Sequence, residues 1–264
     1  GQIKIGDIQQ TVQAFARLQN ALSFFRMFYN KFTAYRARLE RLYGFLLSTE
    51  EKHTARQPDL TEVSDGLILE NVALYRHNGE VLLDGININL KSGNSLLIRG
   101  PSGCGKTSLL RALAGLWPFG SSGKVGHPPL QDILFLPQRP YTAQGSLRDA
   151  ICYPNIDKQH PELIEAMNTC RLGYLVDKLD KPDDWQHKLS PGELQRVAFV
   201  RALLSQPKVI LLDEATAALD EPTEAMLYRA LKQKLPDSII ISIGHRSTLN
   251  EFHDLCLDVG HVQC

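Results

Sequence analysis

The sequence predicts an α/β fold with a mainly parallel sheet, an antiparallel β subdomain, an inserted helical subdomain and a long N-terminal helix. Short runs that are apolar at every position indicate strands buried on both faces of a parallel sheet. Two alternating runs separated by Asn78-Gly79 indicate an antiparallel hairpin. A long stretch without proline carries apolar residues at helical spacing.

The first predicted element covers Asp7 to Leu47, which contains no proline and one glycine. We expect one or two long helices there. Apolar residues recur on a helical period: Phe15, Leu18, Leu22, Phe25, Phe28 and Phe32. The charged and amide residues among them make the stretch too polar for a lipid-facing span. It fits a helix that lines a polar pathway or packs on a partner, and an amphipathic bundle helix is the alternative.

The charge of the chain is uneven. The formal net charge is zero, which argues against a protein built to coat nucleic acid. Residues 1–57 nevertheless hold nine Lys or Arg against four acids. That excess is typical of the cytoplasmic side of a membrane protein, and a basic solvated helix is the other interpretation. Five scattered cysteines favour a reducing compartment.

The sequence contains no window of about 20 consecutive apolar residues, and it contains no signal peptide. We therefore do not expect this chain to span a membrane alone. The chain starts at Gly1, and we interpret it as a piece of a longer protein. The polar stretch Ser48–Ser64 predicts a linker. We therefore divide the chain into residues 1–57 and a main domain, residues 58–264.

Within the main domain, the alternating runs Leu67–Tyr75 and Val81–Leu90 predict the antiparallel sheet. Four continuously apolar runs predict the parallel sheet: Leu96–Ile98, Ile133–Leu136, Val209–Leu212 and Ile239–Ile243. The mainly helical pattern between Ser146 and Ser205 predicts a helical subdomain inserted between core strands.

A glycine-rich loop follows the first buried strand and opens a predicted helix. It consists of Gly100, Pro101, Ser102, Gly103, Cys104, Gly105, Lys106, Thr107 and Ser108. This is a P-loop, whose backbone N–H groups surround phosphate oxygens at the positive end of a helix. Lys106 would reach the β and γ phosphates, and Thr107 would ligate Mg²⁺. We also expect Cys104 to be a reactive thiol that bulky maleimides modify, because the helix N-terminus and Lys106 favour a thiolate.

Two adjacent carboxylates, Asp213 and Glu214, follow the buried run Val209–Leu212. The carboxyl ends of such strands are where open α/β sheets place ligands. Asp213 suits the Mg²⁺ shell, and Glu214 suits the polarisation of an attacking water. A helix cap is the alternative for this pair, and the P-loop in the same chain favours the functional interpretation.

The segment Leu189–Arg196 resembles the signature that separates ABC ATPases from other P-loop proteins. Gln138 resembles the Q-loop residue of that family, and His245 resembles its switch histidine. The run Ala217-Ala218-Leu219-Asp220 resembles its D-loop. These elements occur in order across residues 67–246. The resemblance implies a P-loop NTPase core of the ABC type, an ATPase that uses ATP and Mg²⁺.

The same resemblance assigns site residues. It implies catalytic roles for Glu214, His245, Lys106 and Gln138, and metal ligands at Thr107, Gln138 and Asp213. Two such domains would hold two ATP molecules head to tail, so that the signature residues touch the ATP on the partner's P-loop. These signature residues are Ser190, Pro191, Gly192 and Glu193. Each of these roles has a structural alternative. Ser190 and Glu193 also match a capping box. His245 could be an ordinary loop histidine, and Gln138 could be an ordinary polar loop residue.

Three positions depart from the family pattern. Pro191 replaces the usual glycine and removes a backbone donor. Arg76 stands where an aromatic residue commonly stacks on adenine, and strand alternation points the neighbouring Tyr75 the other way. We expect the Arg76 guanidinium to stack on the base instead, or another group to do so. Glu193 stands where many members have glutamine, and we attach no mechanism to it.

Finer likeness comes from Gly115-Leu116-Trp117-Pro118 and from Gly145-Ser146-Leu147-Arg148-Asp149. These resemble the peroxisomal fatty-acyl half-transporters of subfamily D and the bacterial fused permease-ATPases related to peptide and cobalamin importers. Residues 1–47 resemble the last membrane helix of the bacterial group and its cytoplasmic extension. This implies a transmembrane domain upstream in the same full-length chain and a place on the cytoplasmic face of a membrane, with the bacterial inner membrane favoured over the peroxisomal one.

The function predicted is therefore coupling of ATP hydrolysis to substrate movement across a membrane, without nucleic acid. A soluble ABC ATPase acting on ribosomes or DNA is the alternative. Such relatives usually carry two cassettes or long coiled coils, and neither feature occurs here. A regulatory module that binds ATP without turnover is a third reading, and intact Lys106, Asp213, Glu214 and His245 argue against it.

Overall fold

The computed structural model describes residues 5–50, 59–63, 65–154 and 156–259. The chain divides into two compact units, Gly1–Thr54 and Ala55–Cys264, and each is described by itself.

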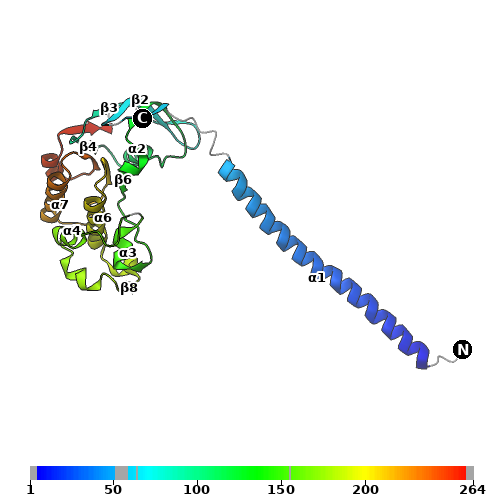
Figure 1. The fold of residues 1–264 in the computed structure, drawn as a ribbon. Helices are drawn as coiled ribbons and strands as arrows, with labels where there is room; N and C mark the ends of the chain where they lie inside the picture. The colour runs from blue at the N-terminus through cyan, green and yellow to red at the C-terminus, as the bar shows by residue number, and fades with distance from the viewer. Residues whose placement is uncertain (1–4, 51–58, 64, 155, 260–264) are drawn as a thin grey trace. The chain divides into compact units, whose positions relative to one another are not determined.

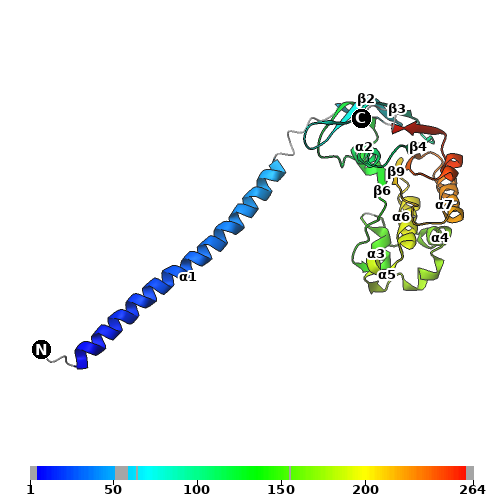
Figure 2. The same cartoon turned by 180° about the vertical axis from the view of Figure 1, so that it is seen from behind.

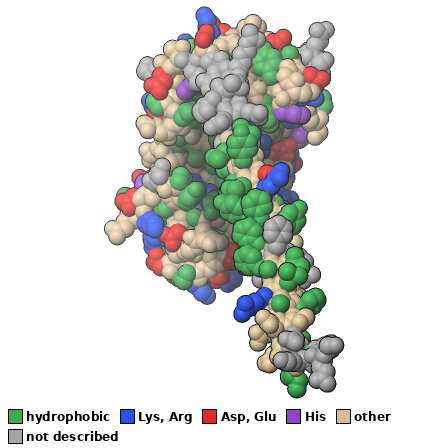
Figure 3. Space-filling model, turned by 90° about the vertical axis from the view of Figure 1, so that its right-hand side faces the viewer, with side chains coloured by type: hydrophobic (Ala, Val, Ile, Leu, Met, Phe, Trp, Pro, Cys, Tyr) green, Lys and Arg blue, Asp and Glu red, His purple; other side chains and the backbone are tan. Residues whose placement is uncertain are grey.

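The first unit contains one uninterrupted helix, α1 (Ile5–Glu50), which confirms the predicted helix. Its apolar side chains are exposed along its length, and Figure 3 shows them gathered on it. The side chain of Phe25, one of the predicted apolar positions, lies outside the described part of the chain. Within the described residues, no helix has a segment both long and apolar enough to cross a membrane.

A four-stranded sheet forms one end of the second unit. It contains β1 (Asp59–Glu62), β5 (Ser121–His127), β2 (Leu67–Tyr75) and β3 (Val81–Leu90), in that order. The predicted hairpin between β2 and β3 is confirmed. Gly79 takes the left-handed backbone conformation, and the Arg76 N–H donates to the Glu80 carbonyl at 2.8 Å. Part of the predicted linker is strand, because β1 pairs in parallel with β5.

The second sheet is entirely parallel and has the order β11-β4-β10-β9-β6. Its strands are β11 (Leu255–Asp258), β4 (Ser95–Arg99), β10 (Ile239–Ile243), β9 (Val209–Asp213) and β6 (Ile133–Leu136). Strands β9 and β10 are buried at every position. Along β9, Val209 and Leu211 belong to one hydrophobic core, and Ile210 and Leu212 belong to the other. This alternation explains why the buried runs are apolar throughout.

Helices occupy the rest of the unit. They are α2 (Lys106–Leu113), α3 (Leu147–Cys152), α4 (Leu163–Thr169), α5 (Trp185–Lys188), α6 (Pro191–Ser205) and α7 (Glu221–Lys234), with the 3-10 helices η2 (Leu130–Asp132), η3 (Gly173–Lys178) and η4 (Ser247–Phe252). A two-residue strand pair, β7 (Gly145–Ser146) with β8 (Pro182–Asp183), sits in the inserted region. Figures 1 and 2 show α3 to α6 at the end of the unit opposite β2 and β3, which confirms the inserted helical subdomain.

Candidate functional site

The glycine-rich loop connects the end of β4 to the start of α2, as the sequence predicts. Gly103 and Gly105 have left-handed backbones. A Cβ on Gly105 would lie 3.1 Å from Leu83 of β3, so the close approach of that strand also favours glycine here. The Lys106 ammonium donates to the carbonyls of Gly100 at 2.8 Å and Pro101 at 2.7 Å. The loop therefore folds around its own lysine, and the ammonium lies within the loop where a phosphate would bind.

Cys104 lies in this loop, but its side chain turns inward. Its residue exposure is 8%, and it belongs to the hydrophobic core that also contains β4. This burial contradicts the expectation that a bulky maleimide reaches the thiol. The side chain packs with apolar neighbours of that core instead of facing solvent.

Thr107 and Asp213 form an oxygen pair between α2 and β9. The Thr107 hydroxyl donates to Asp213 Oδ1 at 2.9 Å. Burial raises the pKa of the Asp213 carboxyl; the Thr107 hydrogen bond opposes that rise and the neighbouring Glu214 charge adds to it. A bound cation would relieve the desolvation, and hydroxyl and carboxylate oxygens are the ligands that Mg²⁺ prefers.

The described residues hold no group of three or more His, Cys, Asp or Glu that could bind a metal alone. Mg²⁺ usually takes one or two protein ligands and fills its shell with water and substrate phosphates. The Thr107–Asp213 pair beside the phosphate loop therefore fits that ion.

Glu214 lies one residue beyond β9 and has a φ of 49°, in the left-handed region that non-glycine residues rarely adopt. Its N–H donates to the Ile243 carbonyl at 3.2 Å. The Gln138 amide, just after β6, donates to Glu214 Oε2 at 2.9 Å. His245 Nε2, just after β10, lies 3.4 Å from Glu214 Oε1. Three strand ends thus deliver an amide, a carboxylate and an imidazole to one place.

The structure pairs Gln138 with Glu214, whereas Thr107 and Asp213 pair with each other. The resemblance implied that Gln138 is also a metal ligand. That role stays a prediction.

The signature residues begin α6. Ser190 is its N-cap, and its hydroxyl donates to Glu193 Oε2 at 2.6 Å, within a complete capping box. Pro191 occupies the first helical position, where a backbone N–H has no partner within the helix, so the missing donor leaves no gap in the ladder. A Cβ on Gly192 would lie 3.3 Å from the Ala218 carbonyl. The signature backbone therefore packs against the D-loop.

Glu193 also accepts a hydrogen bond from the Tyr174 hydroxyl. Burial opposes ionisation of Glu193, but hydrogen bonds from Ser190 and Tyr174 outweigh it and hold the pKa of the carboxyl below its usual range. In the described part of the chain, no hydrogen bond or ion pair joins this group to the P-loop. The structure thus brings the P-loop, Asp213, Glu214, Gln138 and His245 together, whereas the described side-chain hydrogen bonds of Ser190 and Glu193 join these two residues to each other and to Tyr174.

Asp220 and Arg76 lie at exposed turns. Asp220 is the N-cap of α7 and accepts from the Thr223 N–H at 3.3 Å. A hydrogen bond from the Thr223 side chain is the main cause that lowers the pKa of its carboxyl, and the backbone bond adds to it. The Arg76 side chain is exposed at the β2–β3 turn. Tyr75 is half-buried, and its hydroxyl contacts Ser122 Oγ at 3.1 Å, away from that turn. Stacking of Arg76 on adenine stays a prediction.

Sequence reasoning missed a buried ion pair beside the site. The Glu224 carboxylate is 2% exposed and lies 3.5 Å from Arg246 Nη1. Thr216 donates to the same carboxylate at 2.5 Å, and Thr248 donates at 3.2 Å. Arg246 also donates to the Leu219 carbonyl at 2.7 Å. The pair therefore links the loop after His245 to the D-loop. Glu224 reads in sequence as an ordinary acid in the first turn of a helix, so nothing local reveals its partner.

Gln195 was missed as well. It is a buried amide inside the apolar face of α6, and a lone glutamine within an apolar helical run is the signal that could have identified it.

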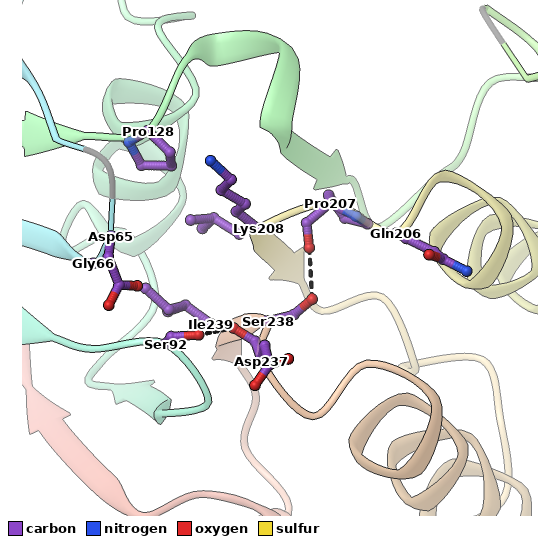
Figure 4. Close-up of a pocket in the computed structure, with 11 residues that line it drawn as sticks. Asp65, Gly66, Ser92, Pro128, Gln206, Pro207, Lys208, Asp237, Ser238 and Ile239 are labelled. Carbon is purple, nitrogen blue, oxygen red and sulfur yellow. Dashed lines mark hydrogen bonds between the residues drawn. The ribbon is translucent and has the colours of Figure 1, made fainter.

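A cavity of about 290 Å³ lies at the other end of the parallel strands, where β9 and β10 begin (Figure 4). Ser238 donates to the Pro207 carbonyl there, and Ser92 donates to the Asp237 carbonyl. None of the predicted site residues lines this cavity.

Comparison with known proteins relates the chain to one family. The family model described as ABC transporter matches residues 83–217. The chain is 54% identical to "Uncharacterized ABC transporter ATP-binding protein" of Haemophilus influenzae over 98% of its length and 44% of that protein. It is 34% identical to "ABC transporter D family member 2, chloroplastic" of Arabidopsis thaliana over 98% of the chain and 47% of that protein.

Among solved structures, the chain resembles a bacterial Atm1-family ABC exporter with ATP bound. The TM-score is 0.66 and the identity is 25%, over 78% of this chain and 40% of that one. The chain spans less than half the length of each of these relatives.

Proposed function

The chain belongs to the ABC transporter family and contains its ATP-binding, ATP-hydrolysing domain; from that premise we propose that it couples ATP hydrolysis to movement of a substrate across a membrane. The observation that carries the proposal is the meeting of P-loop, Asp213, Glu214, Gln138 and His245 at one edge of the parallel sheet. The relatives are described as transporters. Nothing favours the alternative of a ribosomal or DNA-acting ATPase.

The proposed reaction is attack of water on the γ phosphorus of ATP. The oxygen–phosphorus bond to the β phosphate breaks, and ADP and inorganic phosphate leave. The P-loop N–H groups and Lys106 bind and orient the phosphates. Thr107 and Asp213 would hold Mg²⁺, which supplies positive charge against the phosphate oxygens. Glu214 accepts the proton of the attacking water.

Gln138 and His245 orient the water and the γ phosphate, because both contact Glu214 from neighbouring strand ends. Gln138 additionally connects the nucleotide site to a membrane domain in this proposal. Gln138 lies 2.9 Å from the Glu214 carboxylate and His245 lies 3.4 Å from it. The three groups therefore need no large rearrangement to act together.

We further propose that a second copy of the chain completes the site. Ser190, Glu193 and the Gly192 N–H lie apart from this chain's own P-loop group, so they are available to the ATP of a head-to-tail partner. Asp220 of the D-loop adjoins the same surface, since Gly192 packs against Ala218. Pro191 leaves fewer backbone donors there than glycine would.

Residues 1–57 are proposed as the end of a transmembrane domain and its linker, and residues 58–264 as the ATPase domain. The exposed apolar side chains of α1 support a partner for that helix. We propose that the ATPase lies at the cytoplasmic face of a membrane, and we favour the bacterial inner membrane. The transmembrane domain lies upstream in the same full-length protein in this proposal.

The variant Glu214→Gln tests the proposal because it keeps the shape and removes the carboxylate. Steady-state hydrolysis should fall about a hundredfold to ten-thousandfold, which is the usual effect of losing a positioned general base. ATP affinity, measured by equilibrium binding of a labelled nucleotide, should change little because the phosphate contacts remain. A variant that hydrolyses ATP near the parental rate, or that no longer binds ATP, contradicts the role given to Glu214.

A further inference from the structure

Gln195 lies in the second turn of α6, the helix that begins with the signature residues. Its residue exposure is 2%, and its helical neighbours Leu194, Val197 and Ala198 belong to the hydrophobic core. A buried primary amide has two donor hydrogens and an acceptor oxygen, and leaving them without partners is unfavourable. The identity of its partners is therefore informative.

Those partners come from three different loops. Gln195 Nε2 donates to the Gln138 carbonyl at 3.1 Å and lies 3.5 Å from the Glu214 carbonyl. Gln195 Oε1 accepts from the Ala218 N–H at 3.0 Å. One side chain thus holds the backbone of the Q-loop, the backbone of the proposed general base and the backbone of the D-loop.

The backbone of Glu214 needs such support. Its φ of 49° is an uncommon, strained conformation for a residue other than glycine, and it persists only where the surroundings hold it. The Ile243 carbonyl accepts from the Glu214 N–H, and Gln195 Nε2 lies 3.5 Å from the Glu214 carbonyl oxygen. The direction of the Glu214 carboxylate depends on this backbone. Gln138, whose side chain contacts that carboxylate, is held by the same amide.

We propose that Gln195 is a positioning residue for ATP hydrolysis, which fixes Glu214 and Gln138 relative to the helix that carries the signature. The inference rests on the proposed function. It adds that the two ATP sites of a dimer are mechanically connected within each chain. A shift of Gln138 or Glu214 at this chain's own ATP is transmitted to α6 through the hydrogen bonds of Gln195. Ser190, at the N-cap of α6, faces the partner's ATP in the proposed dimer.

Two substitutions separate the hydrogen bonds from the packing. Gln195→Met fills a similar volume and makes none of the three bonds. Gln195→Glu keeps the acceptor for the Ala218 N–H and replaces the donating nitrogen by a carboxyl oxygen. When ionised, that oxygen repels the Gln138 carbonyl; when protonated, it can donate to it. Gln233→Glu, the same chemical change at an exposed position of α7, is the matched control.

The experiment measures kcat and KM for ATP hydrolysis and the Kd of a labelled non-hydrolysable ATP analogue, using the 264-residue chain in detergent. Gln195→Met should lose about tenfold to a hundredfold in kcat, as expected for a misplaced catalytic group, while KM and Kd change less than about threefold. Gln233→Glu should match the parent in all three quantities.

The pH dependence of Gln195→Glu supplies the sharper readout. Burial raises the pKa of a carboxyl at this position, so the protonated donor form gains population as pH falls. The ratio of its kcat to the parental kcat should therefore rise severalfold between about pH 8.5 and pH 6. Gln195→Met should show a flat ratio, because it has nothing to protonate.

Three results overturn the inference. Gln195→Met with parental kcat shows that the bonds do not position Glu214. Equal loss of kcat and of analogue binding shows a general structural role. If Gln195→Glu folds and the ratio of its kcat to the parental kcat does not change with pH, the donor group of Gln195 is irrelevant. If Gln195→Glu shows no cooperative melting transition, the Gln195→Met result decides. A parent that hydrolyses no ATP refutes the proposed function itself, and that outcome is distinguishable from these three.

Discussion

The first unit exposes phenylalanine side chains to solvent, whereas the second unit buries Phe199 in its core. In α1, Phe15 and Phe28 are exposed, and Phe28 retains 57% of its accessible surface. In the second unit, Phe199 retains 1%, because Tyr228 packs edge-on against it with ring centroids 6.3 Å apart. Burial of apolar area is the main favourable contribution to folding. The second unit therefore contains the partners that stabilise its core, whereas Phe15 and Phe28 of α1 stay exposed.

Because of this contrast, we expect substitutions in the two units to change different properties. In the nucleotide-binding unit, a change beside a buried charge should alter the free energy of unfolding. In α1, a change on the exposed face should alter association and leave that free energy as it is. Each prediction below tests one side of this contrast.

The largest effect is expected at Arg246. Arg246→Met removes the partner of the buried Glu224 carboxylate and leaves only the Thr216 and Thr248 hydroxyls to hold it. An uncompensated buried charge costs about 3–5 kcal/mol, which lowers the melting temperature of a unit of this size by roughly 10 °C. Calorimetry or circular dichroism checks this.

A second variant provides the control. Arg246→Met with Glu224→Gln no longer buries a charge, and part of the lost stability should return. Unfolding of the single variant at the parental temperature would show that the ion pair contributes nothing measurable.

A smaller effect is expected at His253. Burial, with the positive charges of Lys232 and Arg99, lowers the pKa of this imidazole, although its hydrogen bond to the Leu249 carbonyl opposes the shift. The unfolded chain then binds more protons than the folded one as pH falls below the ordinary value of 6.5. Stability should fall with pH in that range, by at most about 1.4 kcal/mol per pH unit.

Denaturant unfolding of the parent and of His253→Phe at several pH values between about 7.5 and 5.5 measures this slope. The substitution should reduce it. Identical slopes for the two proteins mean that other groups cause the pH dependence.

The smallest effect on stability is expected in α1. Phe28→Ser should shift the unfolding free energy of the second unit by less than about 0.5 kcal/mol, because Phe28 is exposed. Removal of residues 1–56 should instead make the protein more monodisperse, since the exposed apolar helix favours self-association. Analytical ultracentrifugation compares the two forms. If the shortened protein is no more monodisperse than the parent, α1 is not the cause of association.

The same contrast explains what the sequence could predict. The P-loop, the hairpin at Asn78-Gly79 and the capping box of Ser190 depend on neighbours within a few residues, so their patterns are local. The strand β5 is rich in serine and glycine, and only its pairing with β2 and β1 makes it a strand. Gln195 contacts Gln138 and Glu214, which lie 57 and 19 positions away in the sequence. No local pattern encodes such contacts.

Cys104 illustrates the reverse error. Its position in the P-loop predicts a reactive thiol, yet Cys104 is only 8% exposed and belongs to a hydrophobic core. For α1, the sequence predicts the helix and its apolar surface.

The most direct test of the central claim, that ATP is hydrolysed between two copies of this domain, is the mass of Glu214→Gln in solution. Light scattering should be performed on residues 57–264, so that α1 cannot mimic the result, with and without ATP and Mg²⁺. The account predicts a monomer without nucleotide and a dimer with it. Adding Ser190→Arg should return the protein to a monomer that still binds labelled ATP at its P-loop. A protein that stays monomeric with saturating ATP and Mg²⁺, or a dimer that survives Ser190→Arg, would contradict the claim.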